Sequence, residues 1–257
     1  MDSLKGTIVC ITGASSGIGE ATAMEFAGRG CPLILAARRK DRIDALARDI
    51  TGRFHVDVYA LKTDVRDRAA VETAFTSLPE QWRDIGILVN NAGLSRGLEP
   101  LHKGSIEDWE EMIDTNINGL LYVTRAVLPG MVSRNKGHII NLGSTAGHQT
   151  YPGGNVYSAT KHAVKALNRS LKMDLLGTQV RVTSVDPGLV ETEFSKVRFH
   201  GDTERAGQVY AGLTPLRGSD IAEIIVFCAS RPSHVAIQEL IVTPTDQAHS
   251  TMVHRRK

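Results

Sequence analysis

The stretch "TGASSGIGEATAMEFA", residues 12–27, contains three closely spaced glycines followed directly by a helical pattern. The apolar run "TIVCITG" precedes it, so Gly13, Gly17 and Gly19 lie between a strand and a helix. Glycine lets the backbone turn tightly and approach a pyrophosphate, whose charge the free amides of a helix N-terminus can bind. In this context the Gly-x3-Gly-x-Gly spacing predicts a dinucleotide-binding turn.

Further apolar runs of strand length follow, separated by helical patterns. They cover residues 32–38, 56–65, 85–93, 137–145, 180–188 and 237–244. Runs this continuous are typical of strands buried on both faces, and each parallel return needs a crossover long enough for a helix. We therefore predict a single α/β domain over residues 1–257, with a doubly wound parallel sheet of about seven strands and helices on both faces.

Composition places the chain among globular proteins, with 42% apolar and 23% charged residues. The 30 basic and 28 acidic residues are mixed along the chain, which argues against a nucleic-acid-binding face. No apolar run reaches the length of a membrane span, and no signal-peptide pattern opens the chain. Cys10, Cys31 and Cys228 lack the spacing of a disulfide framework or a zinc site. We expect a cytoplasmic protein with no nucleic-acid or membrane partner.

The least regular segment, residues 189–217, follows the carboxyl end of a predicted strand and carries three glycines. In an open α/β sheet ligands bind at that edge, so the segment is either a mobile lid on the substrate side or a plain surface loop. The tail at 246–257 runs on after the last predicted strand. Its basic end, "HRRK", is interpreted as solvated.

The end of the second strand indicates which nicotinamide cofactor is bound. An acid there would bind the ribose 2′-hydroxyl of NAD and repel a 2′-phosphate. The sequence instead reads "AARRKDR", and Arg38 and Arg39 offer planar cationic donors for a phosphate, which favours NADP. Asp64 and Val65 follow the third strand and could hold the adenine edge. Residues 90–93 could approach the adenosine side, although each of these positions is also common in turns and caps.

Tyr157 and Lys161, in "GGNVYSATKHAV", share one face of a predicted helix. A nearby cation favours the phenolate, so the pair suits proton exchange with an alcohol or carbonyl oxygen, although an isolated pair of this kind is usually a surface feature. Ser144 ends the fifth strand and could meet the same oxygen. Asn116 lies in a long helical stretch where a buried amide needs partners, and a water linking it to Lys161 would provide a proton route.

The motifs "TGASSGIG", "NNAG", "TN" at 115–116, Ser144 and Tyr157-Ser-Ala-Thr-Lys161 together resemble the short-chain dehydrogenase/reductase family. The resemblance covers nearly the whole chain and implies a Rossmann-type fold with NADP(H) as cofactor. Within the family, stretches such as "GHIINLGSTAG", "YPGGNVYSATKHAV" and "VRFHGD" are similar to the bacterial NADP-dependent 3-hydroxy acid dehydrogenases. That group includes serine, allo-threonine and malonic semialdehyde oxidoreductases.

The resemblance implies a role for each catalytic residue. Tyr157 is the acid/base, Lys161 lowers its pKa and holds the nicotinamide ribose, Ser144 stabilises the substrate oxygen, and Asn116 completes the relay. Residues 186–192 are expected to close over the nicotinamide, and no metal is required. The implied cofactor-binding residues are Gly13, Ser15, Ser16, Gly17, Ile18, Gly19, Arg38, Arg39, Asp64, Val65, Asn90, Ala92, Gly93, Tyr157, Lys161, Pro187, Gly188, Val190 and Thr192.

A small 3-hydroxy acid or its semialdehyde needs a cation for its carboxylate, and Arg198 and Arg96 are the two candidates. The charge of Arg96 leaves open a larger or differently charged substrate, including a sulfonated aldehyde. A 3-ketoacyl thioester reductase and a catalytically silent NADP-binding regulator are the alternative functions, although the complete catalytic set argues against the regulator. The resemblance also implies a homotetramer, in which the tail either edges a neighbour's pocket or is a disordered end.

Overall fold

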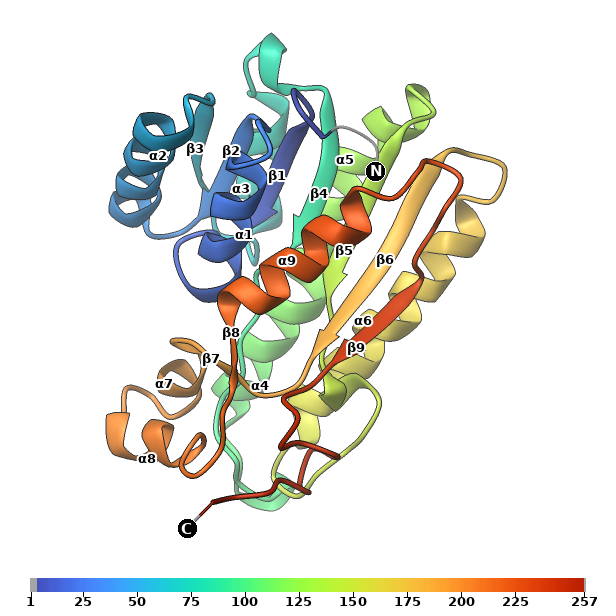
Figure 1. The fold of residues 1–257 in the computed structure, drawn as a ribbon. Coiled ribbons are helices and arrows are strands. Elements are labelled where there is room, and N and C mark those ends of the chain that lie inside the picture. The colour runs from blue at the N-terminus through green and yellow to red at the C-terminus, as the bar shows by residue number, and fades with distance from the viewer. Residues whose placement is uncertain (1–3, 257) are drawn as a thin grey trace.

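The computed structural model describes residues 4–256, and within them seven parallel strands form one twisted sheet in the order β3-β2-β1-β4-β5-β6-β9 (Figure 1). The strands are β1 (Ile8–Thr12), β2 (Leu33–Ala37), β3 (Val58–Lys62), β4 (Ile85–Asn90), β5 (Gly137–Leu142), β6 (Val180–Pro187) and β9 (Glu239–Val242). Each apolar run that the sequence marks contains one of these strands. The prediction of a doubly wound parallel sheet is confirmed.

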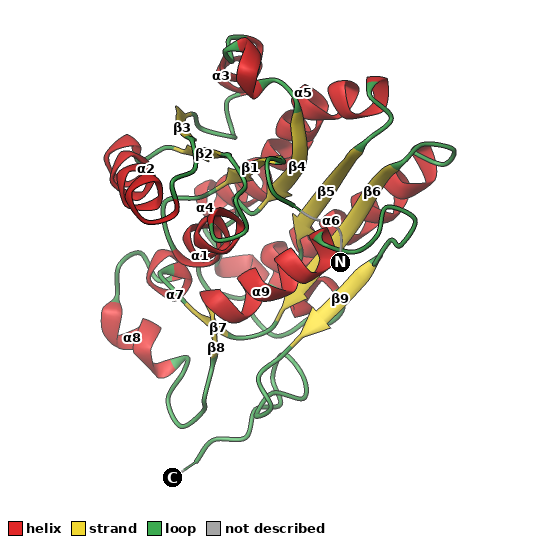
Figure 2. Cartoon of the chain, turned by 45° about the horizontal axis from the view of Figure 1, so that its top comes forward, coloured by secondary structure: helices red, strands yellow, loops and turns green. Residues whose placement is uncertain are grey.

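Helices cover both faces of this sheet, as Figure 2 shows. On one face the core is shared with α1 (Gly17–Ala27), α2 (Lys40–Phe54) and α9 (Gly218–Ala229). The other face carries α3 (Arg68–Thr76), α5 (Gly119–Ser133) and α6 (Asn155–Asp174), with α4 (Ile106–Ile113) packed against α6. The central strands are therefore buried on both sides.

Strand β1 shows why the apolar runs are continuous. Val9 and Ile11 point into the core beneath α1, α2 and α9, whereas Cys10 between them points into the core beneath α3 and α5. Successive side chains of a strand face opposite sides of the sheet, so both sets must be apolar here. All three are fully buried.

The predicted strands extend too far at their carboxyl ends. We expected strands over 56–65, 85–93 and 137–145, but β3, β4 and β5 end at Lys62, Asn90 and Leu142. Beyond β4 the chain bends toward β1 instead of continuing the ladder, because the amides of Asn91 and Ala92 donate to the Thr12 hydroxyl at 3.1 and 3.0 Å. The residues that follow these strands therefore line a cavity and do not extend the sheet.

The 189–217 segment, expected to be irregular, contains four short elements. They are β7 (Val190–Glu191), α7 (Phe194–Arg198), α8 (Thr203–Gln208) and β8 (Leu216–Arg217). The two-residue strands β7 and β8 pair in parallel and join the two ends of the segment. Elements this short leave too few residues for a hydrophobic period to be recognised.

The basic end of the tail packs against the 189–217 segment. The Arg255 guanidinium donates to the carbonyl of Val209 at 3.1 Å, and the Arg256 amide donates to the carbonyl of Gly212 at 2.7 Å. Both arginines remain exposed. The basic residues that we interpreted as a solvated end are therefore hydrogen-bonded to the 189–217 segment.

No helix among residues 4–256 is both long and apolar enough to cross a membrane. The three cysteines are buried and unpaired. Burial raises the pKa of the Cys10 thiol to about 12, which marks it as a packing residue.

Candidate active site

A cavity of about 730 Å³ lies at the carboxyl ends of the sheet strands. Residues that follow β1, β2, β3, β4, β5 and β6 form one wall, and residues of the 189–217 segment and the tail form the other. The strand order reverses between β1 and β4, and such a switch point is where open α/β sheets bind ligands. The cavity has the volume expected of a small-molecule site.

The three glycines after β1 have distinct structural requirements. Gly13 and Gly17 adopt φ values of +65° and +60°, in the left-handed region that favours glycine. A Cβ atom on Gly13 would lie 2.9 Å from the Cα of Ala92, and one on Gly19 would lie 2.5 Å from the carbonyl oxygen of Gly13. Side chains at these positions would displace the turn, so glycine is required.

The N-terminus of α1 opens into this cavity. Ser16 precedes the helix but makes no side-chain cap bond, so the first helical amides remain available for a ligand phosphate. Ser15, Ser16, Gly17 and Ile18 all line the cavity. The turn and the helix end therefore fit the pyrophosphate of a dinucleotide.

Arg39 provides a cationic site beside the glycine turn. Its guanidinium donates to the hydroxyls of Ser15 and Ser16 at 2.9 and 2.7 Å and pairs with the Glu193 carboxylate at 3.0 Å. Arg42 also pairs with Glu193, and these two arginines lower the pKa of Glu193 to about 2. Arg38 lines the same end of the cavity with a half-exposed side chain. This end of the cavity fits a phosphate, with Glu193 as the anion that now pairs with Arg39.

Asp64 and Val65 line the cavity where the sequence places them. The Asp64 carboxylate is 2.7 Å from the Arg66 guanidinium. Partial burial opposes ionisation, but the bonds from Arg66 hold the pKa of Asp64 below its usual value. Val65 packs so closely on α5 that a Cβ on Gly119 would overlap it. Asp64 is thus a fixed anion, and Val65 is part of the hydrophobic wall.

The cavity wall after β4 is formed by Asn91, Ala92 and Gly93. Asn90, which we expected to bind cofactor, lies behind this wall and is 4% exposed. Its amide donates to the Thr124 hydroxyl and to the Asn141 side chain, both at 2.9 Å. Gly19 also lies outside the cavity wall. The remaining predicted cofactor-binding residues all line the cavity.

Tyr157, Lys161 and Ser144 converge on the same cavity from α6 and from the end of β5. Tyr157 and Lys161 are 8% and 7% exposed, and the Lys161 ammonium lies 5.9 Å from the centre of the phenol ring. Lys161 donates to the carbonyl of Leu142 at 2.8 Å. The Ser144 hydroxyl accepts from the amide of Ala146 at 3.1 Å. The four-residue spacing on α6 therefore places a phenol and an ammonium in one site.

Burial disfavours the charged forms of both Tyr157 and Lys161. It raises the pKa of Tyr157, while Ser144 and the Arg198 guanidinium act in the opposite direction. It also lowers the pKa of Lys161 to about 8, against the attraction of the Asp186 carboxylate. The phenol thus has a cation from the 189–217 segment near it, in addition to the lysine expected from the sequence.

Asn116 lies on a π-helical turn, Asp114–Asn118, that interrupts the long helical stretch between α4 and α5. It is 2% exposed and does not line the cavity. Its side chain accepts from the amide of Leu94 at 2.9 Å and donates to the Thr160 hydroxyl at 3.0 Å. A Cβ on Gly93 would lie 3.2 Å from the Asn116 oxygen and 3.6 Å from the Lys161 nitrogen. Glycine at 93 thus leaves space between these two side chains.

The structure separates the two arginines considered for the substrate. Arg198 lines the cavity, with its guanidinium 5.2 Å from the centre of the Tyr157 ring. It donates to the Ser95 hydroxyl at 2.9 Å and to the Tyr151 hydroxyl at 2.6 Å, and these bonds orient the guanidinium. Arg198 therefore places a cation beside the phenol.

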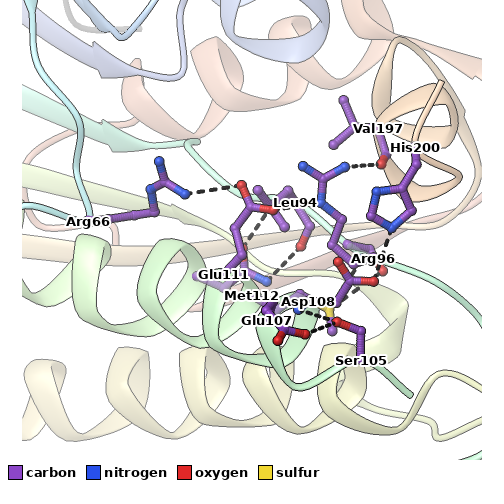
Figure 3. Close-up of polar contacts among 12 residues, drawn as sticks. Arg66, Leu94, Arg96, Ser105, Glu107, Asp108, Glu111, Met112, Val197 and His200 are labelled. Atoms are coloured by element: carbon purple, nitrogen blue, oxygen red, sulfur yellow. Dashed lines mark hydrogen bonds and ion pairs between the residues drawn. The ribbon is translucent and has the colours of Figure 1, made fainter. Parts of the chain in front are cut away.

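Arg96 lies outside the cavity wall. Figure 3 shows its contacts with Glu111 and Val197. Its guanidinium pairs with the Glu111 carboxylate at 2.7 Å and donates to the carbonyl of Val197. Arg66 approaches the same carboxylate at 3.1 Å. The surroundings of Arg96 are those of a residue that ties α4 to α7.

Residues 186–192 reach across the cavity to the glycine turn. Thr192 approaches most closely, because a Cβ on Gly17 would lie 3.2 Å from its side chain. Pro187, Gly188 and Val190 line the same wall. The segment therefore forms the part of the cavity wall that faces the glycine turn.

Sequence reasoning missed several residues of the cavity wall. Five of the omitted side chains are Tyr151, Glu193, Phe194, Ser195 and Tyr210. All but Tyr151 belong to the 189–217 segment, whose short helices have no clear hydrophobic period. The available signal was the pair Glu193 and Phe194, which follows the predicted strand at 180–188 by a few residues. It places an anion and an aromatic ring at the edge of the sheet where ligands bind.

Comparison with known proteins assigns the family. The family model described as short chain dehydrogenase matches residues 7–202. The NADP-dependent 3-hydroxy acid dehydrogenase YdfG of Salmonella typhi is 53% identical over 250 residues, which cover 96% of this chain and 99% of that protein. The NADP-dependent 3-hydroxy acid dehydrogenase of Schizosaccharomyces pombe is 44% identical over the full length of both chains.

A solved structure agrees with these relatives. The closed form of a serine dehydrogenase complexed with NADP+ superposes with a TM-score of 0.91 and 47% identity, covering 98% of this chain and 100% of that one. The chain belongs to the short-chain dehydrogenase family and is an oxidoreductase. The family resemblance read from the motifs is confirmed.

Proposed function

We propose that the protein transfers a hydride between NADP(H) and the hydroxyl-bearing carbon of a small 3-hydroxy acid. The observation that carries this proposal is the Arg198 guanidinium, 5.2 Å from the ring centre of Tyr157 in the same cavity. A planar cation binds a carboxylate in two-point fashion and would hold the acid group while the hydroxyl meets the phenol. Small 3-hydroxy acids have these two groups at a short distance.

The cofactor is NADP(H). The glycine turn and the α1 N-terminus suit its pyrophosphate, and Arg38 and Arg39 suit its 2′-phosphate. Relatives named as NADP-dependent and the neighbour complexed with NADP+ support this choice. When bound, the cofactor supplies the hydride-accepting and hydride-donating ring.

The side chains divide the proton chemistry among them. Tyr157 takes the hydroxyl proton during alcohol oxidation and returns it during carbonyl reduction. Ser144 binds the same substrate oxygen, and Lys161 stabilises the phenolate and holds the nicotinamide ribose. Asn116, from its π-helical turn, completes a proton route through the space beside Gly93. Positioning of the reactants can by itself lower a reaction barrier by ~7–11 kcal/mol.

The wall around Arg198 favours a short substrate. The guanidinium lies 5.6 Å from the ring centre of Phe194 and 5.9 Å from that of Tyr151, so two aromatic rings enclose the proposed carboxylate site. Tyr210 adds a third ring to the cavity wall, and its hydroxyl bonds to Ser195 at 2.8 Å. Serine, allo-threonine, 3-hydroxypropionate and the matching semialdehydes combine the required groups within this length.

The test is to incubate the protein with a panel of substrates and to measure the absorbance of the reduced nicotinamide. The panel contains L- and D-serine, L-allo-threonine, 3-hydroxypropionate, 3-hydroxyisobutyrate and a hydroxysulfonate, each with NADP+ or NAD+. We expect NADP+ reduction with one or more of the carboxylates. Turnover of the hydroxysulfonate alone would indicate a sulfonated aldehyde as substrate. No activity with any panel member, together with activity on 3-ketoacyl thioesters, would identify a thioester and not a hydroxy acid as the substrate. Tight NADPH binding without any turnover would favour a regulator.

A homotetramer in the cytoplasm completes the proposal. The basis for both is the family resemblance together with the sequence composition, and the tail would then contact a neighbouring subunit. Light scattering after size-exclusion chromatography measures the oligomeric state directly. A mass of one subunit, 27.9 kDa, would contradict the tetramer.

A further inference from the structure

The polar face of α6 continues one turn beyond the catalytic pair. Lys165 follows Lys161 by four residues, as Lys161 follows Tyr157, so the three side chains share a face. The Lys165 ammonium is 2.7 Å from Nδ1 of His148, and Nε2 of His148 is 2.5 Å from Oδ2 of Asp186. A hydrogen-bonded chain therefore leads from half-buried Lys165 to the buried Asp186 carboxylate.

The donors and acceptors along this chain define its charges. An ammonium can only donate, so Nδ1 of His148 accepts from Lys165, and the Nε2 proton is donated to Asp186. The Ser184 hydroxyl donates to the other carboxylate oxygen of Asp186. Asp186 is 1% exposed, yet both of its oxygens have donors. The arrangement suits an ionised Asp186 and a neutral His148.

Asp186 also lies close to the catalytic lysine. A Cβ on Gly143 would overlap the Oδ1 atom of Asp186, so the carboxylate contacts the backbone at Gly143. The carbonyl of the preceding residue, Leu142, accepts from the Lys161 ammonium at 2.8 Å. The buried anion and the buried cation therefore flank the same two residues at the end of β5.

We propose that His148 and Lys165 are positioning residues: they hold Asp186 as an anion, and this anion stabilises the positive charge of Lys161 beside Tyr157. The inference rests on the proposed function, because it assigns a charge state to the catalytic pair. His148 lies outside the cavity wall and does not touch the proposed substrate or cofactor site.

The electrostatics of the buried groups agree with this role. Burial raises the pKa of Asp186, whereas the hydrogen bonds from Ser184 and His148 lower it. Burial lowers the pKa of Lys161 to about 8, whereas Asp186 raises it. Loss of His148 would make Asp186 easier to protonate, and a neutral Asp186 would let Lys161 lose its proton at lower pH.

The charged groups that face His148 argue against a metal ion at this cluster. Ligand atoms of His148, Asp186 and Glu239 lie within 4.8 Å of one another, as they would around a cation. However, the Lys165 ammonium is 2.7 Å from His148 and 3.9 Å from Glu239, and the Arg169 guanidinium is 3.3 Å from Glu239. These two cations already neutralise the cluster, so it is a network of hydrogen bonds and ion pairs.

Substitutions at His148 test the chain. His148→Leu removes both the acceptor and the donor, whereas His148→Gln retains one of each in its amide. We expect the alkaline limb of the kcat profile to move about one pH unit lower in His148→Leu and in Asp186→Asn, because an opposite charge near Lys161 is lost. His148→Gln should restore most of this shift. His162→Leu, on the exposed face of α6, is the matched control and should keep the wild-type profile.

A second readout needs no turnover. Protein with 15N-labelled histidine gives the tautomer of each imidazole by NMR, and the His148 signal is assigned by its disappearance in His148→Gln. We expect a neutral ring protonated at Nε2. This measurement uses the wild-type chain and therefore holds even if His148→Leu does not fold.

The outcomes separate this inference from the proposed function. An active enzyme whose pH profile is unchanged in both His148→Leu and Asp186→Asn would overturn the inference and leave the function intact. A His148 ring protonated at Nδ1 would also overturn it. A wild-type protein that oxidises no hydroxy acid but shows the Nε2 tautomer would contradict the function and support the hydrogen-bonded chain.

Discussion

Tyr157 has two cations near its ring, one from the same helix and one from the 189–217 segment. The Lys161 ammonium is 5.9 Å from its ring centre and the Arg198 guanidinium is 5.2 Å away. Burial raises the pKa of Tyr157, whereas the hydrogen bond with Ser144 and the charge of Arg198 lower it. Arg198 therefore has two effects in the proposed function. It binds the substrate carboxylate and it favours the phenolate.

Replacing Tyr157 by phenylalanine separates proton transfer from binding. The variant keeps the ring that packs against Phe194 but loses the hydroxyl, so NADPH should bind with nearly unchanged affinity. Turnover should fall by about 10²- to 10⁴-fold, the usual contribution of general acid–base catalysis. Fluorescence titration with NADPH and steady-state rates measure the two effects. Full activity in the variant would remove Tyr157 from the mechanism.

Replacing Arg198 by alanine should raise KM for carboxylate substrates by at least about tenfold, because a charge-assisted hydrogen bond to the substrate contributes ~1.5–3 kcal/mol. The same change removes a cation that lowers the pKa of Tyr157. Alcohol oxidation requires the phenolate as base, so the acid limb of its kcat profile should move to higher pH. Measurements of KM and kcat from about pH 6 to about pH 10, the range in which the phenol and the lysine titrate, test both effects.

Arg205→Ala is the control for Arg198→Ala. Arg205 lies in the same 189–217 segment, but its guanidinium stacks on Phe199 outside the cavity wall. Its removal should leave KM and the pH profile unchanged. Equal effects of the two substitutions would indicate a general loosening of the segment and would move the carboxylate site away from Arg198.

At the scale of elements, the glycine turn was readable from the sequence because its requirement is local. A strand, a turn with φ values of +65° and +60°, and a helix are contiguous in the chain. Three of the four predicted catalytic residues, Ser144, Tyr157 and Lys161, line the cavity, and each was predicted from a strand end or a helical spacing, which are also local features. Structure adds their surroundings, such as the π-helical turn that carries Asn116.

What could not be read from the sequence depends on distant contacts. The ion pair of Arg39 with Glu193 joins residues 154 positions apart, and no local pattern indicates that partner. Asn90 was predicted to line the cavity because it ends β4. Side chains alternate between the two faces of a strand, however, and that of Asn90 points toward α5 and Asn141. Predicting which side of the strand end faces the ligand requires the register, which depends on the neighbouring strands.

Substitution of two glycines tests the turn against an ordinary helix. Gly13→Ala combines an unfavourable left-handed conformation with a 2.9 Å approach to Ala92, so it should destabilise the fold by at least ~1–2 kcal/mol and abolish NADPH binding. Gly52→Ala, in α2 with open space around it, should stabilise the fold by about 0.5–1 kcal/mol. Urea unfolding measures both. Similar changes at the two positions would contradict the assigned role of Gly13.

Glu193 couples the 189–217 segment to the cofactor end of the cavity. Its pKa of about 2 keeps it ionised at neutral pH, so it competes with a 2′-phosphate for Arg39. Glu193→Gln should therefore tighten NADPH binding by about two- to fivefold, as expected for an exposed ion pair, and leave NADH binding unchanged. Glu191→Gln, an exposed acid in the adjoining strand β7, is the matched control. Weaker NADPH binding in Glu193→Gln would mean that the carboxylate assists the phosphate site.

The sheet as a whole was predictable because burial on both faces forces apolar runs wherever a strand lies. The contact between the tail and the 189–217 segment, which both line the cavity, was not predictable from the sequence. The tail and the 189–217 segment meet through Arg255 and Arg256, two exposed residues that composition alone assigns to solvent. The 189–217 segment and the tail thus form one wall of the cavity together. Their contact depends on the whole fold, because the α9 helix and β9 separate them in the sequence.

Stability of the whole molecule should depend on His138, the second residue of β5, which is 3% exposed. The Thr183 hydroxyl donates to the carbonyl of Ile237 and so accepts from Nε2 of His138, while Nδ1 has no hydrogen-bond partner within residues 4–256. Protonation would place an unpaired charge in the core near Arg181, and burial therefore lowers the pKa of His138 well below its usual value.

The unfolded chain binds a proton at His138 below about pH 6.5, whereas the folded chain does not, so the free energy of unfolding should fall by ~1.4 kcal/mol for each further pH unit of acidification. Urea unfolding from about pH 7.5 to about pH 5, which spans the pKa of an unfolded histidine, measures this slope. In His138→Leu this contribution to the slope should vanish, while His234→Leu, at an exposed position, retains it. An unchanged slope in His138→Leu would mean that His138 also binds a proton in the folded chain and that its site accommodates the charge.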